Sequence, residues 1–484
     1  MRRVALMCGF MLYAVPFQAQ TNGKIAITTR SESARQLFLR GRALNETLKP
    51  HEAHELFVQA VAVDHDFAFG EYSIASTAPI SKEVTEHLHR AVLLASNASL
   101  GERLIILGMQ ARRNADRSLA RQLAESLVTA YPRDERAHLT LASVYSAQQL
   151  YPKSITEYER AIALNSQYSL AYNQLGYANR SVGNNAAAED AFKRYIALLP
   201  NDPNPRDSYA ELLMKTGRFD ESIAQYQAAL SIDPHFSGSF VGIAGDQMYL
   251  GKHSAAIAEL EVYYKQARDD NERRTALINE SMVLVDQGST DKAIAAMDRA
   301  RAIANAAGDT ANLAADEITT GDILLDAHRI AEARDRYAKG HALLAASSAA
   351  PDVKNDDALA RHYDLARLAL AAHDLPTAKS EASAYLRGAV DRKNDVRVRQ
   401  AHHLDALVAL GEGRFDAAIL NLALADQENP AVWQARGRAL EAKGDMAKAR
   451  ANYERARSMN VLPTFDYVFV RAATREPTRA AERR

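Results

Sequence analysis

One position in this sequence returns every 34 residues and holds a small side chain each time, at Gly108, Ala142, Gly176, Ala210 and Ala244. Two neighbouring positions keep the same spacing. The first is also small, at Ala120, Ser154, Ala188, Ser222 and Ala256, and the second is mainly bulky, at Ala124, Tyr158, Phe192, Tyr226 and Leu260. A fixed period of roughly 20–50 residues is typical of an array of one structural unit stacked on copies of itself. The period therefore restricts the chain to a fold whose core grows by stacking.

Breaker residues divide each period into two helical halves. Prolines mark the ends of three of four successive periods, at Pro132, Pro200 and Pro234, and Ser166 takes this position in the other one. A proline ends a helix because its nitrogen carries no hydrogen and its ring clashes with the preceding turn. Glycines stand near the middle of three periods, at Gly183, Gly217 and Gly251. Each unit is therefore predicted to be two antiparallel helices joined by a turn, with small residues where helices approach closely.

The period and the residue types resemble the tetratricopeptide repeat (TPR). The best single match covers residues 169–202, where the family's aromatic, Leu-Gly, Ala, Phe and Pro positions are filled by Tyr172, Leu175, Gly176, Ala188, Phe192 and Pro200. Asn179 and Tyr195 depart from the family pattern. The resemblance implies an all-α fold, a right-handed α-solenoid (superhelix) of TPR-like antiparallel helix pairs. It also implies a concave face, lined by the first helix of each pair, that holds peptides, helices or other domains.

The array is expected to change character along the chain. Residues 34–270 form the N-terminal TPR array, and the 34-residue period is strongest at 101–270. Residues 271–460 predict looser and longer repeats, with turns near Gly288, His328, His373, Gly413 and Gly444. Residues 343–357 favour a linker, either a hinge or a long surface loop. Residues 461–484 predict a segment that caps the last pair, followed by a disordered tail.

The first residues, 1–19, are predicted to be a bacterial secretory signal peptide. Arg2 and Arg3 precede an apolar run over residues 4–17, shorter than the roughly 20 residues of a comfortable bilayer span. Cleavage after Ala19 would leave a polar leader at residues 20–33.

The signal segment has two consequences. Cys8 is the only cysteine and would leave with the signal, so the mature chain would have no disulfide and no cysteine metal site. The mature chain is then expected to be periplasmic or associated with the cell envelope. Two alternatives stay open: cleavage after Ala14, and a retained segment that anchors the chain to the inner membrane.

Neither composition nor motifs indicate catalysis. The chain has 59 basic and 60 acidic residues, a formal net charge of −1, and this balance does not favour nucleic-acid binding. It contains no phosphate-binding loop, zinc-protease motif, nucleophile elbow or calcium loop. Nearby histidines, such as His402 and His403, lack the spacing and third ligand of a zinc site. We therefore predict a protein that is not an enzyme and has no catalytic residue, cofactor or bound metal.

Eight residues are predicted to bind a partner. They lie off the packing stripe of the first helices in the regular region: Arg136, Asn173, Tyr177, Arg180, Asp207, Glu211, Met248 and Tyr249. Asn173, Tyr177 and Arg180 recur at i, i+4 and i+7 on one helical face. They would offer an amide to a peptide backbone, an aromatic edge and a cation for carboxylates. The alternative interpretation is an ordinary solvated helix face.

Three functions are compatible with these features. The preferred one is an exported, non-catalytic scaffold that binds a protein or peptide partner in its concave groove, with no nucleic acid and with membrane contact only through a retained signal segment. The second is a cytoplasmic or membrane-anchored regulatory module, similar to the TPR sensor regions attached to bacterial kinases or adenylate cyclases. The third is an enzyme or a carrier of small ligands built into the groove.

Overall fold

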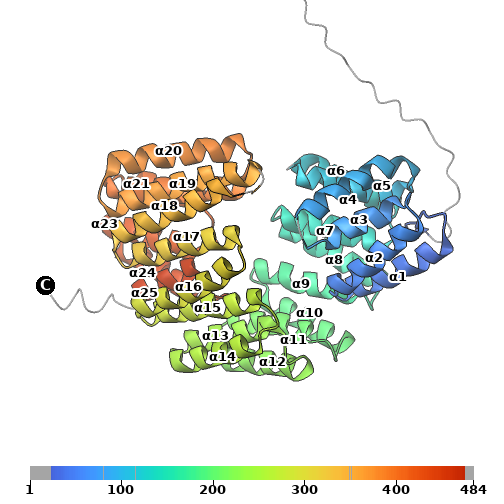
Figure 1. Ribbon diagram of the computed structural model, residues 1–484, viewed down its shortest axis with the longest axis horizontal. Helices are drawn as coiled ribbons and strands as arrows, with labels where there is room; N and C mark the ends of the chain where they lie inside the picture. Colours follow the sequence, from blue (N-terminus) through green and yellow to red (C-terminus); the bar gives the residue numbers. More distant parts are fainter. Residues whose placement is uncertain (1–22, 80, 115, 348, 350, 475–484) are drawn as a thin grey trace, which may run out of the picture. The chain divides into compact units, whose positions relative to one another are not determined.

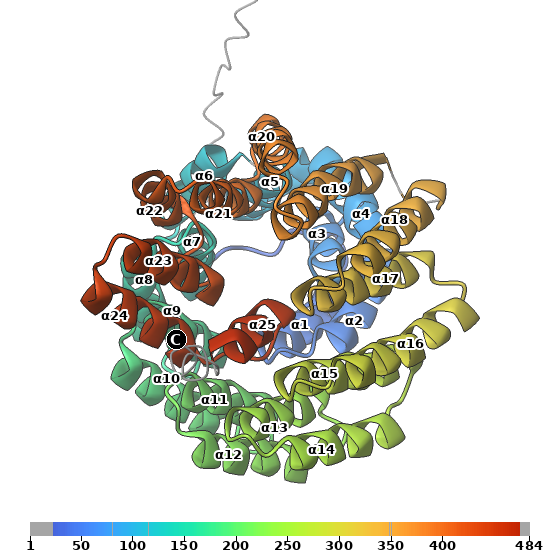
Figure 2. The same cartoon turned by 90° about the vertical axis from the view of Figure 1, so that its left-hand side faces the viewer.

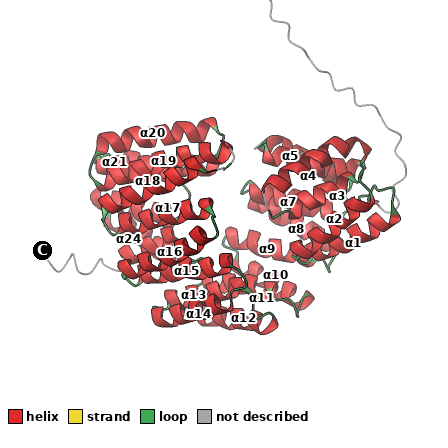
Figure 3. Cartoon of the chain, in the orientation of Figure 1, coloured by secondary structure: helices red, strands yellow, loops and turns green. Residues whose placement is uncertain are grey.

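The computed structural model describes residues 23–474 except Ile80, Ala115, Ser348 and Ala350. Three features of the sequence predictions lie outside the described residues: the signal peptide at 1–19, its Cys8 and the tail at 475–484. All regular secondary structure in the described part of the chain is helical (Figure 3). The helices pair in sequence order, as expected of a TPR superhelix, so the predicted fold class is confirmed.

The chain divides into two compact units, residues 1–198 and 199–484. In the first unit, each helix packs on the next along the sequence (Figure 1). Its helices are α1 (Glu32–Glu46), α2 (Pro50–Val63), α3 (Ala68–Thr77), α4 (Ser81–Leu94), α5 (Leu100–Arg113), α6 (Arg117–Ala130), α7 (Glu135–Ala147), α8 (Tyr151–Leu164), α9 (Ser169–Ser181) and α10 (Asn185–Leu198).

The second unit continues the same pairing and adds one helix after its last pair. Its helices are α11 (Asn204–Lys215), α12 (Phe219–Ile232), α13 (Ser237–Tyr249), α14 (His253–Gln266), α15 (Asp270–Asp286), α16 (Thr290–Ala306), α17 (Thr310–Asp326), α18 (Ile330–Ala346), α19 (Pro351–Ala371), α20 (Leu375–Asp391), α21 (Asp395–Gly411), α22 (Phe415–Leu424), α23 (Pro430–Ala442), α24 (Met446–Ser458) and α25 (Phe465–Thr474).

The odd-numbered helices up to α23 are the first members of their pairs, and several of them contact one another within a unit. Such contacts join α3 to α5, α7 to α9, α11 to α13, α13 to α15, α19 to α21 and α21 to α23. We call these first helices the inner wall of each unit. The inner wall is where the resemblance to the TPR family places a binding surface.

Short polar side chains fix where many helices begin. The residue before the helix accepts a hydrogen bond from a backbone N–H of the first turn at Asp116, Asp134, Asp269, Asp309, Asp374, Asn394, Asn429 and Asp445. Ser99 and Glu102 form a reciprocal capping box at α5. Such a cap stabilises a helix by about 0.5–2 kcal/mol, so these residues set the start of each helix.

A residue in the left-handed backbone conformation ends the turn inside most pairs. Glycine takes this conformation at Gly183, Gly217, Gly251, Gly288, Gly413 and Gly444. Gln149, His328 and His373 adopt it without being glycine, with φ of 59°, 58° and 58°. The predicted turns are therefore confirmed at all five positions after residue 270.

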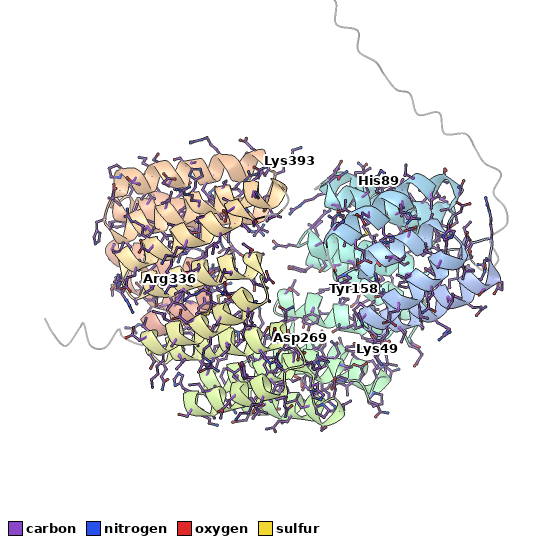
Figure 4. All side chains as sticks on the ribbon, viewed as in Figure 1. Lys49, His89, Tyr158, Asp269, Arg336 and Lys393 are labelled. Atoms are coloured by element: carbon purple, nitrogen blue, oxygen red, sulfur yellow. The ribbon has the colours of Figure 1, made fainter. Side chains whose placement is uncertain are left out.

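The alternation of small and bulky positions is explained by helix crossings. A Cβ atom at Gly176 would lie 2.6 Å from the ring of Phe192, and one at Gly437 would lie 2.5 Å from the ring of Tyr453. Tyr158 is fully enclosed, whereas Lys49 and His89 lie at the surface (Figure 4). Gly108 differs from the other small positions, because a Cβ there would meet nothing within 4 Å.

Longer helices account for the looser repeats after residue 270. Helices α15 to α18 have 17 residues each, against 13 or 14 in α7 to α10. The linker predicted at 343–357 is shorter in the structure, because α18 continues to Ala346 and α19 begins at Pro351. Proline suits the first helical position, where its missing N–H leaves no bond unmade, so the segment after Pro351 is helical.

The predicted polar leader is a packed part of the first unit. Residues 24–30, here called the N-terminal strap, cross the beginnings of α5 and α7 without forming a helix. The backbone N–H of Ile25 donates to Asp134 Oδ2 over 2.7 Å, and that of Thr28 donates to Glu102 Oε1 over 2.8 Å. The same two carboxylates cap α7 and α5, so the strap is bound through the helix caps.

Residues 460–474, here called the C-terminal segment, fold back along the second unit. Their helix α25 contacts α23 and α24, where a cap was predicted, and also α15 (Figure 2). Contact with α15 joins residues far apart in sequence, as the pair Asp286 and Arg471 shows. The segment therefore lies on the inner wall of the second unit.

Candidate functional site

The eight predicted partner-binding residues all lie on first helices, but they belong to both units. Arg136, Asn173, Tyr177 and Arg180 are on α7 and α9 of the first unit; Asp207, Glu211, Met248 and Tyr249 are on α11 and α13 of the second. Asn173, Met248 and Tyr249 are buried, and the other five are half-buried. We consider each group within its own unit.

Arg136 is engaged by its own unit. Its guanidinium donates to Glu46 Oε1 over 2.6 Å and to Glu135 Oε1 over 2.7 Å, and Glu135 also pairs with Lys24 of the strap. Burial opposes the charged form, but the hydrogen bond and charge of Glu46 outweigh it and raise the pKa of Arg136. Glu46 belongs to α1, so this network holds α1 against α7. A partner that used Arg136 would have to compete with these carboxylates.

The predicted triad on α9 separates into a cation–aromatic pair and a buried amide. The Arg180 guanidinium lies 4.6 Å from the centre of the Tyr177 ring, and the edge of that ring meets Phe192 with centroids 5.2 Å apart. Asn173 is only 4% exposed, and its Oδ1 accepts no hydrogen bond within the described residues. A peptide backbone could reach this amide only after the residues that cover it had moved.

Asp207 and Glu211 stand one turn apart on α11. The Ser239 hydroxyl donates to Asp207 Oδ1 over 2.9 Å. Burial, together with the negative charge of Glu211, raises the pKa of Asp207 to about 7, although the Ser239 bond opposes this change. Asp207 therefore gains or loses its charge near neutral pH, and it can contribute pH sensitivity to the inner wall.

Tyr249 binds the backbone of another segment of its own chain. Its hydroxyl donates to the carbonyl oxygen of Val461 over 2.7 Å and accepts from the N–H of the same residue over 3.2 Å. Burial raises the pKa of Tyr249 to about 12, against the Val461 bond and the charge of Arg471, so the hydroxyl keeps its proton. Hydrogen bonds to the main chain give affinity for a peptide whatever its side chain.

Two further contacts hold the C-terminal segment at its ends. A Cβ atom at Gly245 would lie 2.9 Å from Pro463 Cδ, so this proline fits only because Gly245 has no side chain. Arg471 Nε lies 3.4 Å from Asp286 Oδ1, and its guanidinium is 4.4 Å from the centre of the Tyr249 ring. Asp286 is also paired with His253 over 2.8 Å.

Between its two ends, the C-terminal segment packs on the second unit through apolar side chains. Val468 is fully buried in the core of the second unit, and Leu462, Phe465 and Phe469 pack against the same core. Met248, predicted to bind a partner, is 0% exposed and belongs to this core. The C-terminal segment thus covers the part of the inner wall where Met248 and Tyr249 lie.

A cavity of about 430 Å³ lies beside α25, which lines it together with residues of α17, α19, α21 and α23. Its lining combines apolar side chains with Tyr363, Arg367, His403, Gln434, Arg438 and Asp466. Arg367 is fixed by an ion pair with Asp322 over 2.5 Å. Burial and the nearby charge of Arg367 lower the pKa of His403 to about 4, so the imidazole is neutral at physiological pH. The volume is sufficient for a small organic molecule.

Two other kinds of site were searched for among the described residues. No group of three or more His, Cys, Asp or Glu side chains there is placed to hold a metal ion. None of the helices in the described part of the chain is long and apolar enough to cross a membrane.

The sequence did not indicate several residues of this site. Gly245, Asp286 and the C-terminal segment meet through contacts between residues about two hundred positions apart, which no periodicity records. One feature of the sequence could have indicated this contact. Helix α13 carries Gly238, Gly242 and Gly245, although glycine weakens a helix interior, and such a run indicates that another part of the chain approaches closely.

Comparison with known families agrees with the repeat architecture. Models described as tetratricopeptide repeat match residues 107–169 and 139–203, and further such matches cover 208–236 and 430–460. Proteins with this repeat are typically scaffolds for protein–protein interaction and are usually not catalytic. None of the curated proteins matches this chain.

Solved structures with similar parts include three repeat proteins. MamA is 25% identical, with 34% of this chain and 97% of that chain covered, at a TM-score of 0.30. A tetratricopeptide repeat protein from Parabacteroides merdae is 16% identical, covering 56% and 94%, at 0.36. A thermophilic TPR protein of Thermus thermophilus is 20% identical, covering 44% and 98%, at 0.30.

The family matches fall in both units, and the helices pair in sequence order throughout the described residues. The chain therefore contains tetratricopeptide repeats in both of its units.

Proposed function

We propose that this chain is a non-catalytic scaffold that binds a segment of another protein on the inner wall of its second unit. The pair of hydrogen bonds between the Tyr249 hydroxyl and the backbone N–H and C=O of Val461 is the observation that supports this proposal best. It is an example, within one molecule, of the inner wall binding a peptide backbone. Tyr249 was also among the residues that the sequence predicted for partner binding.

The location of the scaffold is a separate part of the proposal. Arg2, Arg3 and the apolar run after them support export of a bacterial protein to the periplasm or envelope, and a retained segment would instead give a membrane-anchored regulatory module. N-terminal sequencing of the chain purified from its source distinguishes the two. A mature chain that begins at Gln20 supports export, and one that begins at residues 1–2 in the membrane fraction supports the anchored module.

Photocrosslinking within cells tests the scaffold itself. A photoreactive amino acid is placed at Asp207 or Glu211 on the inner wall, and at Gln227, an exposed position on α12, as the matched control. We expect one defined protein adduct from the inner positions and none from Gln227. The absence of adducts at the inner positions, or the same adducts at all three, would contradict binding at the inner wall.

The cavity beside α25 favours a second candidate function, the carriage of a small molecule. Its volume of about 430 Å³ and its combination of Arg367, the neutral His403 and apolar side chains suit an organic ligand. Native mass spectrometry of the full chain from its source would detect a bound molecule. The Leu407→Trp variant, which fills the cavity, should then lose the extra mass, and an unchanged mass spectrum would exclude the cavity as its site.

A further inference from the structure

We propose that residues 460–471 occupy a built recognition site as a tethered competitor, and that the partner presents a segment with the same chemistry. The partner segment would have apolar residues and a proline in extended form, followed by a helix with an apolar stripe and an arginine. This inference rests on the proposed function, and it names the partner that the inner wall of the second unit would accept.

The extended part of the site recognises backbone rather than sequence. The Tyr249 hydroxyl donates to the backbone C=O of Val461 and accepts from its N–H, so the bound residue can be any residue other than proline. The proline two residues later is recognised by shape, since its ring carbons lie 2.9 and 3.1 Å from the position of a Cβ at Gly245.

The absence of a side chain at Gly245 is best explained by the contact with Pro463. In the same helix, Gly242 is required by the ring of Tyr226 from its own array, whose atoms would lie 2.2 to 2.6 Å from a Cβ. At Gly245 the nearest atoms belong to Pro463, and the array itself contributes only Met214 Cε at 3.3 Å. Methionine is flexible and can yield. The glycine therefore fits the bound segment more than it fits the packing of α13.

The helical part of the site is selective in shape and charge. Phe465, Val468 and Phe469 fall at i, i+3 and i+4, which places them on one face of α25 and against the core of the second unit. Arg471 lies six residues after Phe465 and pairs with Asp286, which is itself 3% exposed. A carboxylate this deeply buried favours a cation opposite it, so a partner helix should carry arginine at the same spacing.

The C-terminal segment is also suited to release. Helix α25 has 10 residues, and an isolated helix of that length is marginal in water, so α25 depends on the surface that it covers. The short connection from α24 keeps the segment near its site at an effective concentration of roughly millimolar. A free partner would have to compete with this tethered copy, and its apparent affinity would increase when the copy is weakened.

The chain carries its own reporter of release. Trp433 is its only tryptophan, is 9% exposed, and shares an apolar cluster with Val470 of α25. When α25 leaves, Val470 no longer covers the indole, and its emission should shift to longer wavelength. The full chain can therefore be examined without an added label.

The experiment compares full-length proteins with one labelled peptide that has the sequence of residues 459–474. In the Arg471→Glu variant, the new carboxylate opposes Asp286 and should release α25, which the red shift of Trp433 reports. We expect this variant to bind the peptide at least tenfold more tightly than the unaltered chain, measured by fluorescence anisotropy. A control peptide with glutamate in place of its arginine should bind neither protein.

A second substitution tests whether the peptide uses the site itself. Gly245→Val, added to Arg471→Glu, should abolish peptide binding because the side chain fills the place of the proline. Gly108→Val on the same background is the matched control, since a Cβ at Gly108 meets nothing within 4 Å. Peptide binding that survives Gly245→Val, or that is equal in the unaltered chain and Arg471→Glu, would overturn the proposal.

Two remaining outcomes are also decisive. If Trp433 shifts and circular dichroism stays helical, but no peptide binds, the surface is not a recognition site and the proposal fails. If Arg471→Glu leaves Trp433 unshifted, Val468→Asp is used to release α25, and failure of that variant to bind peptide overturns the proposal in the same way. Inner-wall adducts in cells without peptide binding would retain the scaffold function and reject only this partner chemistry.

Discussion

At the scale of single residues, Gln149, His328 and His373 adopt a backbone conformation that glycine adopts in the other turns. Their φ values of 58° to 59° are in the left-handed region, where the Cβ of an L-residue crowds the following carbonyl oxygen. This crowding costs roughly 1–2 kcal/mol per residue. The chain tolerates it because the helices on both sides fix the turn, so each of these sites holds strain that a substitution can relieve.

We expect His373→Gly to raise the free energy of unfolding by about 0.5–1 kcal/mol. His373 is exposed, so its side chain contributes little packing. The reciprocal change, Gly251→Ala, should lower stability by about 1 kcal/mol, because the added methyl meets nothing within 4 Å and only the backbone is strained. Urea unfolding of both variants checks the prediction, and two changes of the same sign would contradict it.

A buried carboxyl on α13 gives a second prediction for a single residue. Asp246 is 0% exposed, and neither of its oxygens has a hydrogen-bond partner within the described residues. The nearby Ser222 hydroxyl already donates to the carbonyl oxygen of Ala210 over 2.8 Å. Burial raises the pKa of Asp246 to about 8, although Ser222 opposes the change. The carboxyl is therefore protonated in the folded chain at neutral pH.

The sign of the pH dependence follows from this raised pKa. Between pH 3.8, the ordinary pKa of an aspartate, and about pH 8, the folded chain holds a proton that the unfolded chain has lost, so stability falls as pH rises through this range. Asp246→Asn removes the charge and should increase stability at pH 8 by about 1–3 kcal/mol, with little change at pH 4. Urea midpoints from pH 4 to 9 measure the difference. A variant that is less stable than the unaltered chain at pH 8 would refute this account.

At the scale of helices, the crossings determine which small residues are required. The sequence placed Gly108 and Gly176 in one class, because both occupy the same position of the repeat. The structure separates them, since a Cβ at Gly176 would meet Phe192 at 2.6 Å and one at Gly108 would meet nothing within 4 Å. The position in the repeat therefore indicates where helices cross, and the local distance between them decides whether a side chain fits there.

The two glycines should respond oppositely to the same substitution. Gly176→Ala forces α9 away from the Phe192 ring of α10 and should cost about 1–3 kcal/mol. Gly108→Ala adds a good helix former in open space and should stabilise by about 0.5–1 kcal/mol. Thermal unfolding of both variants provides the measurement. Equal effects at the two positions would mean that the crossing at Gly176 is looser than its contact distance indicates.

Helices and turns could be predicted from the sequence where residues close in sequence mark their ends. Turns at Gly288, His328, His373, Gly413 and Gly444 could be placed from sequence because each is punctuated within a few residues. The linker at 343–357 could not, since small and polar residues there suited either a loop or the ends of two helices. The strap could not be placed, and of the C-terminal segment only its cap over the last pair could, because the other contacts of both segments are made with residues 74 to 212 positions away.

At the scale of the whole molecule, each unit is closed by a segment that returns to it from one end of the described chain. Residues 24–30 tie α5 to α7 in the first unit, and α25 ties α15 to α23 in the second. A linear repeat array has only neighbour contacts, so its stability is close to a sum over repeats and its ends fray. A returning segment adds non-local contacts, which should make the helices that it joins open together.

Substitution of two buried valines of the second unit can show whether its helices open together or repeat by repeat. Val468 of α25 belongs to a core that spans α11 to α17, whereas Val432 of α23 belongs to a local cluster of α21 to α23. Replacement by alanine should cost about 1–3 kcal/mol of folding free energy at either site, from lost apolar contact and the cavity left behind.

The two variants should differ in their pattern of hydrogen exchange. Val468→Ala should lower protection in α13 and α15 as well as in α23, although nearly two hundred residues or more separate α13 and α15 from α25 in the sequence. Val432→Ala should lower it only in α21 to α23, and the first unit should stay unchanged in both variants. Equal and local losses of protection would mean that α25 rests on the inner wall without coupling its helices, and the second unit would then open repeat by repeat like a linear array.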